Sequence, residues 1–361
     1  YEIRPRDWSS DVCSSDLALQ NRDFDLLITD MQMPSMDGFA LLKTIKDDAF
    51  MRHLPVIVAS GINQLDAVAR CIEMGAEDFL PKPVNPTLLR ARLSTCLEKK
   101  FFRDHEKEYL QTIERTQARL TQELEDAAKY VRSILPEGME QPLRIDWRYQ
   151  PSGELGGDAF GYHWIDDEHM ALYLLDVCGH GVNAALMSVA AINVLRAASL
   201  PNTDFLDPSS VLASLNVTFA MEKHNNMYFT IWYGVYHVPT RKLRHAAGGH
   251  PPALLITSDP ATGNRLQTVA SPGLMIGAVQ DVTYEAMTIT VEPGATLYIL
   301  SDGCYEIARP DNSMLDFDEF QEFMRTHGAS AECLQRLVEW VTELHGPGPL
   351  DDDFSILRIV F

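Results

Sequence analysis

Aspartates that end apolar, strand-like runs or lie in glycine-rich turns are the residues of this sequence best suited to chemistry. Asp158 lies in GELGGDAFG, and Asp176 ends the apolar run LYLLD just before the turn CGHG. Asp302 follows the run TLYILS, and three consecutive aspartates (351–353) precede a final apolar segment. Carboxylate oxygens are preferred ligands of Mg²⁺ and Mn²⁺, and two such ions can activate water for in-line attack on phosphorus. The pattern therefore predicts a two-metal site for phosphoryl chemistry.

Any one of these acidic turns, taken alone, favours an ordinary turn, because Asp and Gly are common turn residues. Their joint occurrence between residues 158 and 352, each beside an apolar run, favours the metal site instead.

Three polar residues nearer the N-terminus could also act together. They follow apolar runs that are separated by segments of helical periodicity, and they are Asp30, Ser60 and Lys82. Such alternation indicates a parallel, doubly wound sheet, whose functional groups gather at the carboxyl ends of the strands. An aspartate can accept a phosphoryl group, a lysine can neutralise it, and a hydroxyl can sense it by hydrogen bonding.

Residues 98–135 carry an apolar repeat with alternating steps of three and four. Its seam consists of Leu110, Ile113, Gln117, Leu120, Leu124, Ala127, Val131 and Ile134. The repeat predicts a coiled coil that joins two copies of the chain, with polar Gln117 fixing the register. A single amphipathic helix packed on its own domain and a solvated spacer are alternatives. Because no Gly or Pro lies between Pro86 and Pro136, we expect one continuous helix.

Composition limits the class of protein. A length of 361 residues suggests two or three domains, and a net charge of −21 argues against nucleic-acid binding driven by bulk charge. Six scattered cysteines without a CxxC pair indicate neither a disulfide framework nor a zinc site, and they are typical of the cytoplasm. The sequence contains no apolar run of membrane-spanning length and no signal peptide, so we expect no membrane partner.

Residues 1–17 show no helical or strand periodicity, and they contain the short repeat SSDVCSSDL. We expect this leader to be disordered or foreign to the natural gene, and it does not enter the prediction of the fold.

Residues 18–97 resemble the response-regulator receiver family through LLITDMQMPSMDG, VIVASG and AEDFLPKP. The resemblance implies that Asp30 is the phosphoacceptor, Ser60 the switch hydroxyl, Phe79 the mobile aromatic residue and Lys82 the lysine before a cis Pro83. It also implies a sensor histidine kinase as partner and one Mg²⁺ ion. A receiver begins with a strand and an acidic pair that binds this ion. Neither is found upstream of Asp30, so we expect a truncated receiver without its first strand, acidic pair and first helix.

Residues 136–361, together with the end of the preceding helix, resemble the SpoIIE-like branch of the PPM family, the metal-dependent protein phosphatases 2C. The motifs are AAKYVRSILPEG, GELGGDAFG, LLDVCGHGVNAALMS, SPGLMIGAV, EPGATLYILSDGCYEI and DDDFSILRI. The resemblance implies two Mn²⁺ or Mg²⁺ ions, which activate the attacking water. The implied ligands are Asp158, Asp176, Asp302, Asp352, the carbonyl of Val177 and, less securely in register, Asp353.

The same resemblance implies a β-sandwich of two antiparallel sheets flanked by helices. We therefore expect a multidomain chain: an incomplete doubly wound α/β receiver, a helical coiled-coil linker (98–135) and an α+β phosphatase domain (136–361). His180 and His250 lie in glycine-rich turns, where we expect them to brace the loops. Asn183 is expected to cap the helix that follows.

Joined together, the two resemblances imply a cytoplasmic, receiver-controlled phosphatase for phosphoserine or phosphothreonine. Its substrate would be a phosphorylated protein, typically an anti-sigma-factor antagonist in a partner-switching pathway. Two alternatives belong to other classes. One is a non-catalytic, receiver-controlled adaptor that binds a sigma factor or its regulator, and the other is a scaffold dimerised by the coiled coil.

Overall fold

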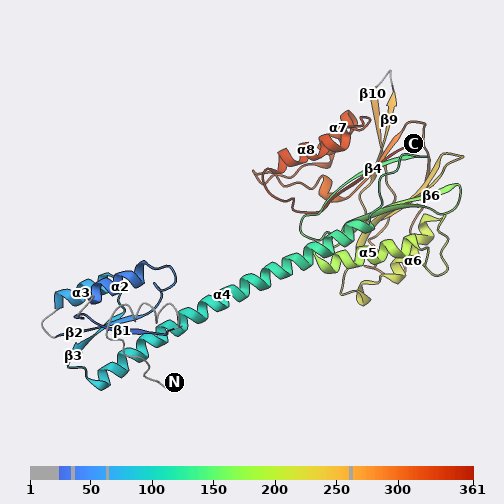
Figure 1. Ribbon diagram of the computed structural model, residues 1–361. Helices are drawn as coiled ribbons and strands as arrows, with labels where there is room; N and C mark the ends of the chain where they lie inside the picture. The colour runs from blue at the N-terminus through green and yellow to red at the C-terminus, as the bar shows by residue number, and fades with distance from the viewer. Residues whose placement is uncertain (1–23, 34–36, 62–64, 260–262) are drawn as a thin grey trace. The chain divides into compact units, whose positions relative to one another are not determined.

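The chain divides into two compact units at the Arg119–Leu120 junction, which lies within the long helix α4 (Pro86–Ile134). The structure, a computed structural model, describes residues 24–33, 37–61, 65–259 and 263–361 (Figure 1). The leader predicted at residues 1–17 lies outside the described residues. Each unit has its own hydrophobic core.

The first unit is a parallel sheet with helices on both faces, as predicted. Its elements are β1 (Leu27–Asp30), α2 (Gly38–Asp47), β2 (Val56–Gly61), α3 (Leu65–Glu73), β3 (Asp78–Lys82) and the first turns of α4. The strands lie in the order β1-β2-β3, and both pairings are parallel. Val56 and Val58 face the core formed with α2 and α3, whereas Ile57 faces the opposite core, which includes Cys96 of α4.

The second unit contains two five-stranded antiparallel sheets, which confirms the predicted sandwich. One sheet has the order β10-β9-β12-β13-β4 and the other the order β11-β8-β7-β6-β5. The strands are β4 (Arg144–Gln150), β5 (Ala159–Trp164), β6 (His169–Val177), β7 (Phe229–His237), β8 (Lys242–Gly248), β9 (Ala253–Asp259), β10 (Gly263–Val269), β11 (Met287–Thr290), β12 (Thr296–Leu300) and β13 (Phe354–Val360). The helices are α5 (Val182–Arg196), α6 (Pro208–Thr218), α7 (Phe317–His327) and α8 (Cys333–His345), with short 3₁₀ turns η1 (Met221–Lys223) and η2 (Asp302–Cys304).

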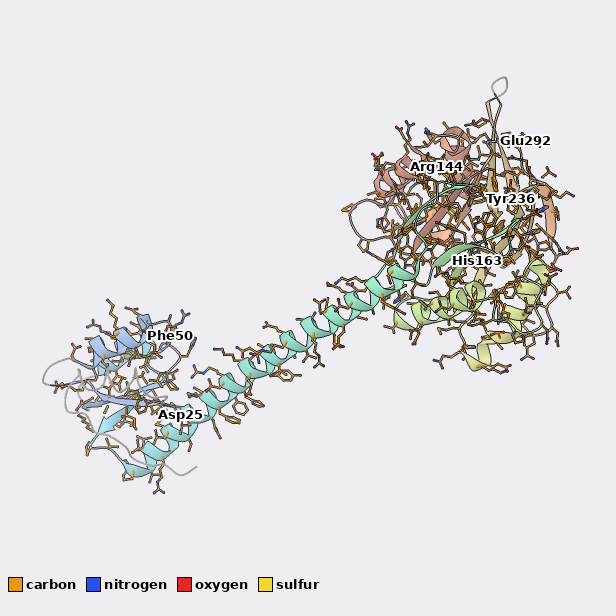
Figure 2. All side chains as sticks on the ribbon, turned by 45° about the vertical axis from the view of Figure 1, so that its right-hand side comes forward. Asp25, Phe50, Arg144, His163, Tyr236 and Glu292 are labelled. Atoms are coloured by element: carbon orange, nitrogen blue, oxygen red, sulfur yellow. The ribbon has the colours of Figure 1, made fainter. Side chains whose placement is uncertain are left out.

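Each sheet is covered on both faces, so its strands alternate between two cores. Along β12, Leu297 and Ile299 face the core between the sheets, whereas Tyr298 and Leu300 pack beneath α7 and α8. Helices α5 and α6 cover the outer face of the other sheet (Figure 1). Side chains fill the space between the layers, and Tyr236 is among them (Figure 2). Because β12 is buried on both faces, all five of its residues are buried.

Helix α4 is continuous over 49 residues, as the absence of Gly and Pro predicted. All residues from 101 to 123 are exposed, and these include the seam residues Leu110, Ile113 and Leu120. In the part of the chain that the structure describes, neither this helix nor any other has an apolar stretch long enough to cross a membrane.

The start of α5 differs from the prediction. Its N-cap is Gly181, which has φ 86°, and no side chain makes a capping hydrogen bond there. Asn183 lies inside the first turn, so the expectation that it caps this helix is wrong. The backbone reaches the helix through Gly179 and Gly181, both in the left-handed region that favours glycine, and this path leaves the cap position to a residue without a side chain.

His245 of β8 makes part of this core sensitive to acid. Its ring is stacked on Trp232 of β7 at 5.5 Å, and its side chain is 1% exposed. Nδ1 has no hydrogen-bond partner among the described residues. Burial lowers the pKa of His245 to about 4. Below pH 6.5 the unfolded chain takes up a proton on this ring, whereas the folded chain does so only near pH 4, so the stability of the fold falls as the pH drops from 6.5 towards 4.

We therefore predict that His245→Phe, which keeps an aromatic ring on Trp232, weakens the loss of stability between pH 7 and pH 5. The wild-type chain should lose about 1–2 kcal/mol more than the variant over this interval. Urea unfolding followed by tryptophan fluorescence at both pH values measures the difference. Equal losses in the two proteins would contradict the prediction.

Candidate active site

Four predicted ligands lie at one end of the sandwich, and each sheet supplies two. Asp158 directly precedes β5, and Asp176 lies near the end of β6; the β5–β6 register pairs Ala159 with Leu175 and so places the two aspartates side by side. Asp302 follows β12 and Asp352 precedes β13, which pairs with β12. We refer to Asp158, Asp176, Asp302 and Asp352 as the carboxylate cluster.

The two most buried members of the carboxylate cluster, Asp158 and Asp176, lie within electrostatic range of each other. Asp158 is 1% exposed, and its pKa is raised well above its usual value by burial and by the nearby charges of Asp176 and Asp353. Burial, together with Asp302 and Asp352, raises the pKa of Asp176 to about 7. These shifts show that the carboxylates lie within electrostatic range of each other in a poorly solvated place.

The two members from the other sheet lie nearer to solvent. Burial, Asp352 and Glu306 raise the pKa of Asp302 to about 6. Burial also raises the pKa of Asp352, while the charge of His180 opposes this shift. His180 therefore lies close to the cluster, at its exposed side.

The residues present are chemically suited to divalent cations. Both carboxylate oxygens of Asp158 are buried without a hydrogen bond of standard geometry, although the Ser301 and Ser355 hydroxyls lie near enough to lower its pKa slightly. A Cβ atom on Gly157 would lie 2.6 Å from the carbonyl oxygen of Val177, so any larger residue at this position would crowd that oxygen. A buried carboxyl group of this kind is neutralised either by a proton, as its raised pKa indicates, or by a cation, and a hard divalent cation suits its oxygen atoms.

The carboxylates share one end of the sandwich but are not drawn together around one point. As the described side chains stand, no three from His, Cys, Asp and Glu are close enough together to hold an ion. Binding would require the carboxylates to turn towards it. The ligand roles of Asp158, Asp176, Val177, Asp302 and Asp352 are therefore predictions that agree with their placement.

Asp353 is placed differently from its neighbour Asp352. Its Oδ1 accepts hydrogen bonds from the backbone N–H of Ser152 (2.8 Å) and the Ser152 hydroxyl (3.0 Å). Its Oδ2 accepts from the backbone N–H groups of Gly157 (2.6 Å) and Asp158 (3.3 Å). Both oxygens are thus occupied by donors, and no contact supports the prediction that Asp353 is a metal ligand. The run of three aspartates marks this segment in the sequence, but only the structure separates their roles.

His250 lies behind the cluster, as expected of a bracing residue. It is 8% exposed, and its Nδ1 lies 2.8 Å from the hydroxyl of Thr230, which pairs with Asp176 across β6 and β7. Burial lowers the pKa of His250 to about 3, so the ring is neutral. Thr230 and the serines 301 and 355 are supporting residues that the sequence patterns did not indicate.

The first unit brings three of its predicted residues to the carboxyl edge of its sheet. Asp30 and Lys82 form an ion pair, and Asp30 accepts a hydrogen bond from the Gln32 N–H at 3.2 Å. Burial alone would raise the pKa of Asp30, but Lys82 and Gln32 outweigh it and hold the pKa below its usual value. The Ser60 hydroxyl, at the end of β2, donates to the Gly61 carbonyl at 3.1 Å. Phe79 packs against the core beneath α2 and α3, and the Lys82–Pro83 peptide is cis as predicted.

Comparison with known families decides what these two units are. The family model for stage II sporulation protein E (SpoIIE) matches residues 166–361. The chain belongs to the SpoIIE family. A second model, the response regulator receiver domain, matches residues 15–94. The chain thus joins a receiver domain to a serine/threonine phosphatase domain of the PP2C type.

Individual relatives agree with this assignment. The phosphoserine phosphatase RsbU of Bacillus subtilis is 27% identical over 254 residues, which cover 68% of this chain and 72% of RsbU. The phosphoserine phosphatase RsbP of the same organism is 27% identical over 213 residues, which cover 55% of this chain and 51% of RsbP.

Solved structures agree in fold. The SiaA PP2C domain of Pseudomonas aeruginosa superposes with a TM-score of 0.58 at 22% identity and covers 68% of this chain and 98% of its own. A SpoIIE fragment from Bacillus subtilis that contains the PP2C phosphatase domain gives a TM-score of 0.52 at 17% identity and covers 62% of this chain and 64% of its own. At these identities the match concerns the fold alone.

The crowded carboxylates lead to a prediction about stability. At neutral pH the ionised form of Asp176 costs folding free energy, because its folded pKa of about 7 lies above the usual 3.8. Asp176→Asn should therefore stabilise the metal-free chain by about 2 kcal/mol and remove most of the stabilisation that Mn²⁺ gives to the wild type. Urea unfolding at pH 8 with EDTA or with Mn²⁺ tests both effects.

Asp167→Asn is the matched control, because Asp167 is an exposed acid in the β5–β6 hairpin. It should change neither the stability of the metal-free chain nor the stabilisation that Mn²⁺ gives. If Asp176→Asn destabilised the metal-free chain, the carboxylates would not be repelling one another as described.

Proposed function

We propose that this chain is a receiver-controlled phosphatase that removes phosphate from phosphoserine or phosphothreonine in a protein. The observation that carries the proposal is the carboxylate cluster, assembled from both sheets of a SpoIIE-family sandwich, with both Asp158 oxygens buried. The names of RsbU and RsbP as phosphoserine phosphatases support the same reaction.

Two divalent cations, Mn²⁺ or Mg²⁺, would be held by the carboxylate cluster and the Val177 carbonyl. When bound, they would supply the Lewis acidity that activates water and neutralises charge on the phosphoryl group. The protein's own part is positional: two sheets fix the four carboxylates at one end of the sandwich. The absence of a side chain at Gly157 keeps the space beside the Val177 oxygen from being crowded.

We further propose that the substrate is a phosphorylated anti-sigma-factor antagonist and that the enzyme acts in a cytoplasmic partner-switching pathway. The similarity to RsbU supports this choice. The overall negative charge of −21 offers no general attraction to an acidic phosphoprotein, so recognition would depend on local shape at the site.

The receiver domain would take its phosphoryl group from a sensor histidine kinase, with Asp30 as acceptor. The Asp30–Lys82 ion pair supports this role, because Lys82 is placed to neutralise phosphoryl oxygens, and Ser60 and Phe79 would respond to the new charge. The domain limits that we propose are 18–97, 98–135 and 136–361.

The exposed seam of α4 is proposed to pair two copies of the chain. Leu110, Ile113 and Leu120 are each at least 43% exposed, which is costly for large apolar side chains on a single helix. Ile113→Glu should convert the dimer to a monomer, because a charge at a seam position is buried on pairing. Light scattering on the full chain measures the mass, and Thr112→Glu, at an exposed position on the side of the helix away from the seam, is the control. A wild-type monomer would contradict the proposal.

Hydrolysis of p-nitrophenyl phosphate in the presence of Mn²⁺ tests the proposed reaction. We expect Asp302→Asn to reduce kcat by at least about a hundredfold, since removal of one ligand disrupts ion binding. A phosphoserine protein from a partner-switching pathway should be hydrolysed by the wild type and not by the variant. If the wild type shows no hydrolysis above Asp302→Asn, the chain is a non-catalytic adaptor or scaffold instead.

A further inference from the structure

Asp353 connects three segments that lie far apart in the sequence. Its carboxylate accepts four hydrogen bonds from the segment of residues 152–158, which we call the Asp158 loop. Its backbone carbonyl accepts a hydrogen bond from the Ser301 hydroxyl at 3.1 Å, in the turn that leads to Asp302. Asp353 itself directly precedes β13. Asp353 therefore contacts the segments that carry Asp158 and Asp302, and it directly follows Asp352 in the chain.

Two glycines show how closely the backbone packs around this residue. A Cβ atom on Gly156 would lie 2.4 Å from Oδ2 of Asp353, and a Cβ atom on Gly303 would lie 2.1 Å from its carbonyl oxygen. By contrast, a Cβ atom on Gly153, in the same loop, would meet nothing within 4 Å. The carboxylate therefore fits against the Asp158 loop without room for an added methyl group.

We propose that Asp353 is a positioning residue, whose carboxylate holds the Asp158 loop so that Asp158 faces the other members of the carboxylate cluster, and that it is not a metal ligand. The hydrogen bond from the Asp158 N–H to the Asp353 carboxylate fixes the backbone position from which the Asp158 side chain projects. An aspartate that bound an ion would have to give up at least one of its four donors. The effect on catalysis rests on the proposed phosphatase function, whereas the effect on the loop does not.

The donors explain why an aspartate is needed here. Three of the four are backbone N–H groups, and both carboxylate oxygens face donors. An asparagine at this position has one acceptor oxygen, so its NH₂ group must face an N–H group of Ser152 or those of Gly157 and Asp158. At least one buried donor then loses its partner, and the loop loosens.

Asp353→Asn in the full chain tests the proposal without any metal. In EDTA, we expect hydrogen exchange of the Gly157 and Asp158 amides to accelerate by about tenfold or more, while the amides of β6 remain as protected as in the wild type. With Mn²⁺, kcat for p-nitrophenyl phosphate should fall by about tenfold or more, with a smaller change in KM. Asp351→Asn, which alters an exposed neighbouring aspartate, should change neither quantity.

Gly156→Ala provides a second route to the same contact. The new methyl group should displace the Asp353 carboxylate and reproduce both effects, whereas Gly153→Ala should be silent. Because both changes break the same contact, the double variant Gly156→Ala/Asp353→Asn should lose much less than the product of the two single losses in kcat. Circular dichroism identifies any variant that fails to fold. In that case Ser152→Ala, which removes only one hydroxyl donor to Asp353, tests the same contact with a smaller perturbation.

A metal-ligand role would give a different result. Asp353→Asn would raise the Mn²⁺ concentration needed for half-maximal activity and leave amide exchange of the metal-free Asp158 loop unchanged, and this outcome would overturn the proposal. If neither the wild type nor any variant hydrolyses p-nitrophenyl phosphate, the proposed function fails. Hydrogen exchange of the Gly157 amide still decides whether Asp353 positions the Asp158 loop.

Discussion

Electrostatic repulsion among four aspartates at one end of the sandwich is the constraint on which the rest of this structure depends. Asp158 and Asp176 are held where water cannot solvate them well, and their pKa values rise because of this burial and, to a smaller extent, because of the neighbouring acids. A flexible chain would move such groups apart. Two antiparallel sheets with a continuous core hold them in place, and the repulsion that remains is the free energy that divalent cations can recover.

The fold satisfies this constraint with few polar residues. Antiparallel pairing brings the end of β6 beside the start of β5, and the end of β12 beside the start of β13, so acids distant in sequence become neighbours. Asp352 and Asp353 are adjacent in sequence but differ in what they contact. Successive side chains of an extended segment point to opposite sides, so Asp352 can face the cluster while Asp353 faces the loop that carries Asp158.

The last turns of α4 also belong to this support. Leu124, Ala128 and Val131 pack in a small cluster with Leu155 of the Asp158 loop and Ala185 of α5. The Gly181 N–H donates to the Leu155 carbonyl at 3.1 Å, which links the loop before Asp158 to the turn after Asp176. The helix therefore ends against both loops that carry the buried acids, and its apolar face at that end is committed to the phosphatase unit.

The sequence alone determined the elements and the chemistry they carry. Three features depend only on residues that are close in sequence, so the sequence reveals them directly. They are apolar runs of strand length, the absence of Gly and Pro through α4, and acids at the ends of strands. They were sufficient to predict the parallel sheet, the continuous helix and a set of acids at strand ends, whereas the sandwich and the choice of Asp352 among three aspartates came from the family resemblance.

Only the tertiary structure decided which groups support the site. The hydrogen bond from Gly157 to Asp353 joins residues 196 positions apart, and Thr230 of β7 meets His250 of the turn after β8; no local pattern encodes either contact. Asn183 failed as a helix cap because the backbone path through Gly181 left that position without a side chain. Hydrogen-bond partners and burial are properties of the packed chain, and they separated Asp353 from Asp352 where the sequence offered three identical residues in a row.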